Sequence, residues 1–283
     1  MTLDACHRPA ATLFGRHRGS AVWIAGSDPS LADYPDTFLD DKIGITLHLA
    51  HLKFPNATYR YSSEYDRSEY LKSVDEGYRK NPIIASWPMY GRNRADTAAL
   101  FSDFGEVYYH RLFSNPPTGV RFEVDPAFTR KKLRRTAAGA ARVWGAHGTC
   151  LHTAFYMAVL MGAAEINLIG AGHGTYLPGV EHFGRAGVVD KDMRPTYPSF
   201  ADPVNNVPVI EQTLALIDAC ADEGIIVNWY RRYAEGALEP LSIDPKWLAE
   251  QKVIAERNRK APSALRRIYR LCKRPVCRII SAL

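Results

Sequence analysis

Histidine and glycine gather in one stretch of the chain, residues 147–187, at spacings that could support proton transfer beside a bound anion. A glycine-rich loop there follows the strand-like segment 165–169 and carries His173 and His182. Imidazole titrates in the range that general acid–base catalysis needs, so we predict a proton-transferring role for this pair. Two surface histidines in a flexible loop are the competing interpretation. A zinc site is disfavoured because no third ligand has a fitting spacing.

Two turns could hold the anionic group of a ligand. Gly148 and Thr149 precede an apolar helical segment, and Thr149 is placed to cap its first turn. Residues 26–30, with the sequence Gly-Ser-Asp-Pro-Ser, follow a buried-strand pattern and could open a second helix. Free backbone N–H groups at a helix start favour phosphate. An ordinary capped turn is the competing interpretation of both. Neither turn is a GxGxxG or P-loop motif, so a dinucleotide or Walker-type site is not predicted.

Two sets of carboxylates are candidates for ligand contacts. Asp190 and Asp192 form an Asp-x-Asp pattern that can hold a divalent cation, but so short a match is common. Asp66 follows the strand-like residues 59–63 and could meet a sugar hydroxyl at the sheet edge. Solvation at the surface is the competing interpretation of Asp66. No metal site is therefore predicted.

The elements that must position these residues are short apolar strands alternating with helices. Expected strands cover 21–25, 43–49, 57–62, 83–87, 106–109, 165–169 and 225–229, and the clearest helices cover 151–162 and 209–223. This order predicts an α/β, Rossmann-like fold with a largely parallel sheet and helices on both faces. We expect a loose leader (1–20), a nucleotide-sugar-binding catalytic domain (21–235) with a lid-like insertion at 88–143, and a basic helical C-terminal extension (236–283).

Positive charge is concentrated at the C-terminal end. The chain has 36 Lys and Arg against 30 Asp and Glu, a net charge of +6, and residues 257–283 contain nine basic and no acidic residues. Leu265, Ile268 and Cys272 recur at helical spacing between arginines. This pattern predicts an interfacial helix on an anionic membrane surface, with a solvated helix as the alternative. Nucleic acid is not an expected partner, because aromatic residues are sparse in this segment.

Other features indicate a cytoplasmic protein, peripheral on the inner face of the cytoplasmic membrane. The five cysteines show no CxxC spacing and fit reduced thiols. No signal-peptide pattern opens the sequence. The longest apolar run, 154–164, is far shorter than the roughly 18 residues that a membrane span needs.

With these motifs in place, the chain resembles the bacterial family 42 glycosyltransferases, which are sialyltransferases of surface glycan synthesis. It is also similar to the related motility-associated and hydroxymethylpterin diphosphokinase-like group. Residues 25–31 are close to the family's Gly-Asn-Gly-Pro-Ser-Leu turn. Gly148 and Thr149 open a helix that leads to the strand 165–170, and His182 follows a dozen residues later. The likeness spans about residues 21–230, and the order of the motifs is its most specific part.

The resemblance implies a CMP-activated acidic sugar as donor, a lipopolysaccharide or capsule glycan as acceptor, and no metal or other cofactor. His182 would be the general base, with His173 as a second catalytic candidate. The implied nucleotide- or donor-binding residues are Gly26, Ser27, Asp28, Pro29, Ser30, His48, Asp66, Gly148, Thr149 and Gly170.

The chain departs from the family pattern at several positions. Asp28 replaces a small glycine, and His48 stands where the family has an asparagine that contacts the donor. Ala171 and Gly172 stand where an acidic residue is often found. In the family, tyrosines stabilise the leaving phosphate; in this chain only Tyr108 and Tyr109 are candidates for that role.

The sequence thus predicts a membrane-associated glycosyltransferase of bacterial surface glycans. Two alternatives stay open. One is a pterin-type diphosphokinase, which would need ATP and magnesium. The other is a non-catalytic module that binds a nucleotide or a glycan.

Deleting residues 260–283 should release the protein from vesicles of anionic lipid, because the deletion removes the apolar positions and most of the basic charge of the interfacial helix. Co-sedimentation with vesicles measures this. Unchanged binding of the shortened chain would refute a membrane role for the segment.

Overall fold

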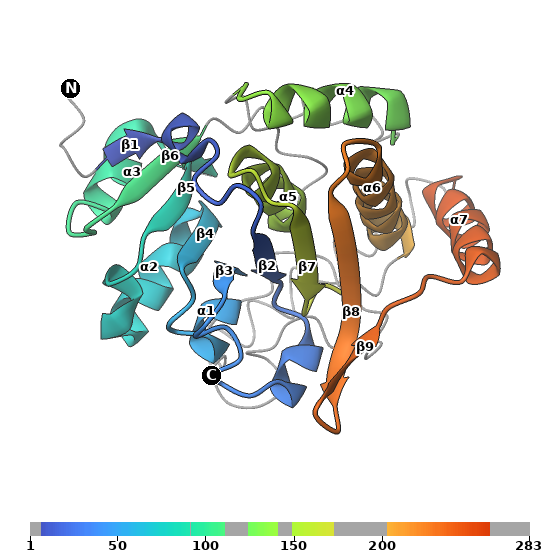
Figure 1. Cartoon of the computed structure of the whole chain (residues 1–283), viewed down its shortest axis with the longest axis horizontal. Helices are drawn as coiled ribbons and strands as arrows, with labels where there is room; N and C mark the ends of the chain where they lie inside the picture. Colours follow the sequence, from blue (N-terminus) through green and yellow to red (C-terminus); the bar gives the residue numbers. More distant parts are fainter. Residues whose placement is uncertain (1–6, 91, 111–123, 141–148, 173–202, 261–283) are drawn as a thin grey trace, which may run out of the picture.

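The computed structural model describes residues 7–90, 92–110, 124–140, 149–172 and 203–260 (Figure 1). Within these ranges nine strands form one sheet in the order β1-β6-β5-β4-β3-β2-β7-β8-β9. The strands are β1 (His7–Pro9), β2 (Ala21–Ala25), β3 (Ile43–Leu47), β4 (Tyr59–Glu64), β5 (Ile83–Tyr90), β6 (Val107–His110), β7 (Glu165–Ile169), β8 (Ile226–Ala234) and β9 (Ala237–Pro240). All neighbours in this sheet run parallel except β8 and β9. The predicted α/β class with a largely parallel sheet is confirmed.

Helices cover both faces of the sheet. The α-helices are α1 (Ala50–Lys53), α2 (Tyr65–Val74), α3 (Arg94–Leu100), α4 (Pro126–Ala137), α5 (Cys150–Leu160), α6 (Pro203–Asp222) and α7 (Pro245–Lys260), and the 3-10 helices are η1 (Ala10–Leu13), η2 (Pro29–Asp33) and η3 (Glu76–Arg79). Along β2, Val22 and Ile24 belong to a core shared with η1, α4, α5 and α6, whereas Ala25 packs with η2 and α1. Because successive side chains of a strand point to opposite faces, β2 contributes to a core on each face of the sheet. The result is a Rossmann-like arrangement of three layers.

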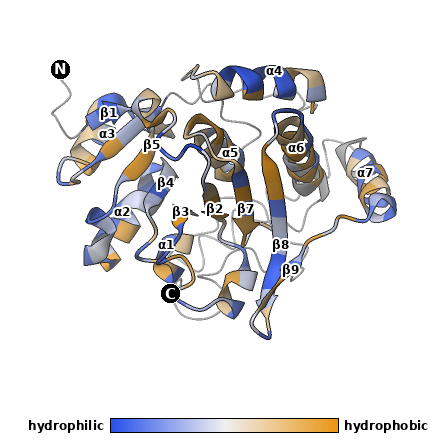
Figure 2. Cartoon of the chain, viewed as in Figure 1, coloured by the Kyte–Doolittle hydropathy of each residue, from blue (hydrophilic) through white to orange (hydrophobic). Residues whose placement is uncertain are grey.

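Helix α5 lies at the centre of the molecule. Every residue from Leu151 to Leu160 is buried, and Figure 2 shows apolar residues concentrated in α5 and in the neighbouring β7. A helix that is apolar all round must be covered on all sides. The sheet covers one side of α5, while α4 and α6 contact it from others (Figure 1).

Residues 7–20 are part of the fold, which contradicts the expectation of a loose leader for this range. β1 pairs with β6 at the edge of the sheet, and Leu13 is completely buried. The backbone N–H groups of Gly15, His17 and Gly19 donate to the carbonyls of residues 160, 161 and 162, at 2.8–2.9 Å. The last carbonyls of a helix lack partners within the helix. A polar, glycine-containing segment is suited to this capping role. Because the segment has no apolar periodicity, the sequence did not indicate that it belongs to the fold.

Two predicted boundaries also differ from the structure. Of the range 88–143, residues 88–110 complete β5, α3 and β6, so they belong to the sheet and its covering layer. Helix α4 packs on α6, and residues 111–123 and 141–143 lie outside the described ranges. The expected domain boundary at 235 falls inside the β8–β9 hairpin. The predicted C-terminal helix is present as α7, which packs on α6.

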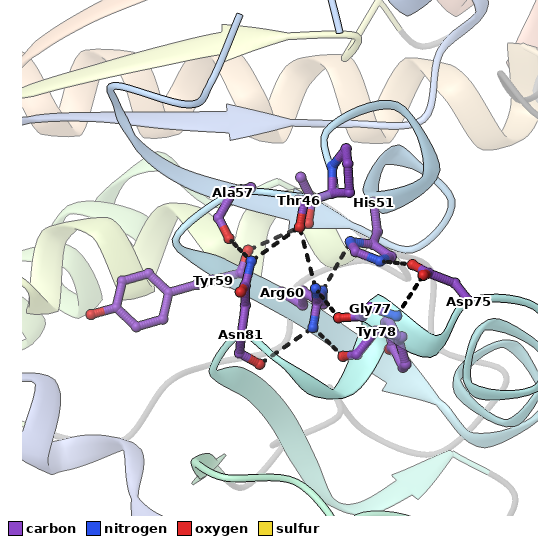
Figure 3. A network of polar contacts seen from close by, with 10 residues as sticks. Thr46, His51, Ala57, Tyr59, Arg60, Asp75, Gly77, Tyr78 and Asn81 are labelled. Atoms are coloured by element: carbon purple, nitrogen blue, oxygen red, sulfur yellow. Dashed lines mark hydrogen bonds and ion pairs between the residues drawn. The ribbon is translucent and has the colours of Figure 1, made fainter. Parts of the chain in front are cut away.

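A buried arginine ties α1, β4 and η3 together (Figure 3). Arg60 of β4 is 1% exposed; its Nε donates to His51 Nδ1 at 2.9 Å and its Nη2 to the Gly77 carbonyl at 2.8 Å. Nη1 donates to the carbonyl of Tyr78. Because His51 Nδ1 accepts from Arg60, the proton of the neutral ring is on Nε2, which donates to Asp75. The guanidinium thus stays charged in the interior because its hydrogen bonds are satisfied.

The His51 ring cannot take a second proton without facing Arg60. Burial and the charge of Arg60 lower the pKa of His51 from 6.5 to about 4. The unfolded chain therefore binds this proton more readily than the folded chain does. The stability associated with neutral His51 is complete above pH 6.5 and is lost as the pH falls towards 4.

We expect the free energy of unfolding to drop by up to about 3 kcal/mol between pH 7 and pH 4 through this one group. The variant His51→Asn keeps an acceptor for Arg60 but does not titrate, so its loss over the same range should be smaller by that amount. Urea unfolding at both pH values measures the difference. Equal losses in the two proteins would show that His51 is not the titrating group.

Candidate functional site

The order of the strands defines one position where the chain changes direction in the sheet. From β2 the chain adds β3, β4, β5 and β6 on one side, and then returns through α5 to place β7 on the other side of β2. Ligands of open parallel sheets bind beyond the carboxyl ends of the strands at such a switch point. The residues that follow β2 and β7 are therefore the first candidates for a site.

Gly26 and Gly170, both predicted as site residues, meet at this switch point. Gly26 N donates to the Ile169 carbonyl at 2.8 Å, and Asp28 N donates to the Gly170 carbonyl at 2.9 Å. A Cβ on Gly26 would lie 2.2 Å from the Gly170 oxygen. Gly170 has a φ of +56°, and a Cβ there would lie 2.5 Å from Leu31. The two glycines let the two loops touch, and this contact explains them without a ligand.

The turn after β2 is capped by its own carboxylate. Asp28 is buried, and its Oδ1 accepts from the backbone N–H of Ser30 at 3.0 Å, so it is the N-cap of η2. Ser27 precedes this cap, while Pro29 and Ser30 are buried in η2. Asp28, and not Ser30, is therefore the residue that caps this turn. A phosphate at the start of η2 would face the Asp28 carboxylate, so this turn is a poor place for an anion.

The start of α5 is a better place for an anion than the start of η2. The Oγ1 of Thr149 accepts from Leu151 N at 3.3 Å, which confirms Thr149 as the predicted N-cap. A helix in a parallel crossover runs against the strands, so α5 begins at the carboxyl edge of the sheet. Its first N–H groups and its dipole favour negative charge there.

Side chains from three elements converge at the start of α5. His48, the residue after β3, places its Nε2 2.7 Å from the Sγ of Cys150. The Oγ of Ser63, on β4, lies 2.9 Å from the same sulfur. Glu64 Oε1, from the end of β4, lies 3.9 Å from His48 Nε2. His48 has a φ of +48°, a left-handed conformation that only a minority of residues other than glycine adopt.

Two buried aromatic side chains lie on β4 and β6, on either side of β5. Tyr61 of β4 stacks on His110, at the end of β6, with ring centroids 5.5 Å apart. Full burial raises the pKa of Tyr61 well above its ordinary value, and ionisation of nearby Cys150 would act in the same direction. Its hydroxyl is therefore a neutral group at physiological pH.

Three other predicted residues have their contacts away from the cluster at the start of α5. The side chain of Asp66 is 83% exposed on α2 and pairs with Arg92 at 3.4 Å. Tyr108 accepts a hydrogen bond from Arg16 at 2.5 Å, and Arg16 also reaches Tyr59 at the start of β4. Tyr109 packs against His7 and Trp87. The roles predicted for these three residues stay predictions.

Several residues considered for the site lie outside the described ranges: Gly148, His173 and His182, and the carboxylates Asp190 and Asp192. Cys150, Ser63, Glu64 and His110 were missed as site residues. The signal that could have found them is positional, because each follows or ends a strand, or begins the helix, at the carboxyl edge.

No family model, no curated protein and no solved structure gives a significant match to this chain. The fold and this edge of the sheet define an α/β protein of Rossmann-like architecture.

Replacing Gly26 by alanine should lower the free energy of unfolding by about 1–3 kcal/mol, because the new methyl group overlaps a backbone oxygen that cannot move freely. Gly105→Ala is the matched control, since nothing lies within 4 Å of a Cβ there. Urea unfolding of both variants measures the effect. If the two variants were equally stable, the loops after β2 and β7 would not be in the close contact described.

Proposed function

We propose that this protein is a glycosyltransferase of bacterial surface glycans that binds a CMP-activated, sialic-acid-like sugar at the carboxyl edge of its sheet. The observation that carries the proposal is the capped start of α5, which lies at the carboxyl edge of the sheet beside the switch point between β2 and β7. An edge of this kind suits a ligand with an anionic phosphate and a flat base. The resemblance of the sequence to the family 42 enzymes narrows the ligand to a CMP-sugar.

In this proposal Gly148 and Thr149 hold the donor phosphate by the first N–H groups of α5. His182 acts as general base and removes the proton of the acceptor hydroxyl, with His173 as its neighbour in the loop. The acceptor oxygen then bonds to the anomeric carbon, the bond from that carbon to the phosphate oxygen breaks, and CMP leaves with the electron pair. The configuration at the anomeric carbon inverts. This displacement needs no metal.

A membrane-bound glycan acceptor fits a protein that binds at the membrane surface. Among the helices that the structure describes, we find none that combines the length and the apolar character needed to cross a bilayer. Of the basic segment 257–283, residues 257–260 end α7 and the rest lies outside the described ranges. In the proposal this segment holds the enzyme on the inner face of the cytoplasmic membrane by its charge.

A comparison of CMP, UDP, GDP and ATP in a thermal-shift assay, each with magnesium and with EDTA, tests the donor. We expect CMP to raise the unfolding temperature most and by the same amount under both conditions, because a ligand that binds only the folded state stabilises it. With the CMP-sugar as substrate, His182→Ala should lower turnover by about 10²–10⁴-fold and leave the CMP shift intact.

Other outcomes lead to different functions. Stabilisation by ATP that EDTA abolishes would overturn the transferase and favour the diphosphokinase. Stabilisation by CMP, with no sugar transfer in the unaltered protein, would indicate a module that binds without catalysis.

A further inference from the structure

The cluster at the start of α5 contains a nucleophile that the proposed sugar transfer does not use. Cys150 is the first residue of α5, and its sulfur contacts an imidazole nitrogen and a hydroxyl, at 2.7 Å and 2.9 Å. The three groups come from α5, from the end of β3 and from β4. Cys150 is therefore not an isolated thiol but one member of a cysteine–histidine pair that the fold assembles.

The surroundings of this pair favour transfer of the thiol proton to the imidazole. The Glu64 carboxylate, 3.9 Å from His48 Nε2, stabilises a protonated ring. The Ser63 hydroxyl can donate to a negative sulfur, and the first turn of α5 adds its dipole in the same sense. The buried hydroxyl of Tyr61, another titratable group near the sulfur, stays neutral. Cysteines at helix starts beside a histidine are the typical reactive thiolates of proteins.

A second cysteine, Cys220, provides an internal control for an unreactive thiol. Cys220 of α6 is buried, and burial raises the pKa of its thiol to about 12. Cys150 is partly exposed. A reagent in solution can therefore reach Cys150 in the folded protein, whereas Cys220 becomes available only when the chain unfolds.

We propose that Cys150 and His48 form a thiolate–imidazolium pair, and that Cys150 is a site of thiol–disulfide exchange with small-molecule disulfides. The Cys150 sulfur attacks one sulfur of the disulfide and forms a new S–S bond, and the bond between the two original sulfurs breaks. Cys150 is oxidised and the departing half of the disulfide is reduced. The leaving thiolate takes its proton from the His48 imidazolium or from water.

Alkylation by iodoacetamide, followed cysteine by cysteine with peptide mass spectrometry on the full chain, tests the pair. At pH 7 we expect Cys150 to react about tenfold faster than free glutathione, because an ordinary thiol is only a few per cent ionised there. Cys220 should stay unmodified. Incubation with oxidised glutathione should attach one glutathionyl group at Cys150, and dithiothreitol should remove it.

The variant His48→Asn removes the base and retains a residue that tolerates a positive φ. Its Cys150 should react at about the rate of glutathione, while Ser63→Ala should cause a smaller loss. His51→Asn is the matched control, since it alters another buried histidine that does not contact Cys150, and it should leave the rate unchanged. Cys220 reports in the same experiment whether each variant is folded.

The pH dependence of the unaltered protein gives a second measurement that needs no variant. The alkylation rate of a thiol with no partner falls tenfold per pH unit below about 8.5, whereas the rate at Cys150 should stay nearly constant from pH 8 to pH 6. A rate that falls as for glutathione, or one that His48→Asn leaves unchanged in a folded protein, would overturn the proposal. Neither measurement includes a nucleotide, so the outcome is independent of the proposed transferase function.

Discussion

The burial of α5 is the constraint on which the rest of the structure depends. A helix with apolar side chains on every side gains stability only when it is enclosed, and here the sheet, α4 and α6 enclose it. Enclosure fixes both ends of the helix. The carbonyls at its C-terminal end accept from the N–H groups of Gly15, His17 and Gly19, and its first residue meets side chains from the ends of β3 and β4. The polar edge of the protein is thus positioned by its most apolar element.

The fold could be predicted from the sequence because its signals are local. The segments 21–25 and 165–169 were placed to the residue, since a run of apolar residues bounded by turn residues predicts a buried strand. The N-terminal segment could not be placed in this way. Residues 15–19 join the fold by backbone hydrogen bonds to another element, and such bonds leave no pattern in the side chains.

The candidate site was predictable only in part, and the carboxylate shows why. β4 was expected over 57–62, but it covers 59–64. This shift of two residues makes Glu64 the acidic group at the end of the strand and carries Asp66 into the first turn of α2, where it faces solvent. The contact between Cys150 and His48 could not be predicted, because it joins residues 102 positions apart. Such contacts follow from the strand order, which the sequence does not state.

The electrostatic field at the start of α5 bears on both the proposed donor phosphate and the proposed Cys150 thiolate. A helix start stabilises negative charge of any origin, whether on a phosphate or on a thiolate. The Cys150–His48 pair shares one proton between two groups, so its net charge is zero whichever group holds it. The pair therefore does not repel an anionic ligand as a lone thiolate would. A bound phosphate would favour the protonated imidazole, as Glu64 already does. It would also compete with the sulfur for the same hydrogen-bond donors at the start of α5. The phosphate and the thiolate are therefore alternatives at the start of α5. Neither can bind at the start of η2 instead, because the Asp28 carboxylate already accepts the Ser30 N–H there.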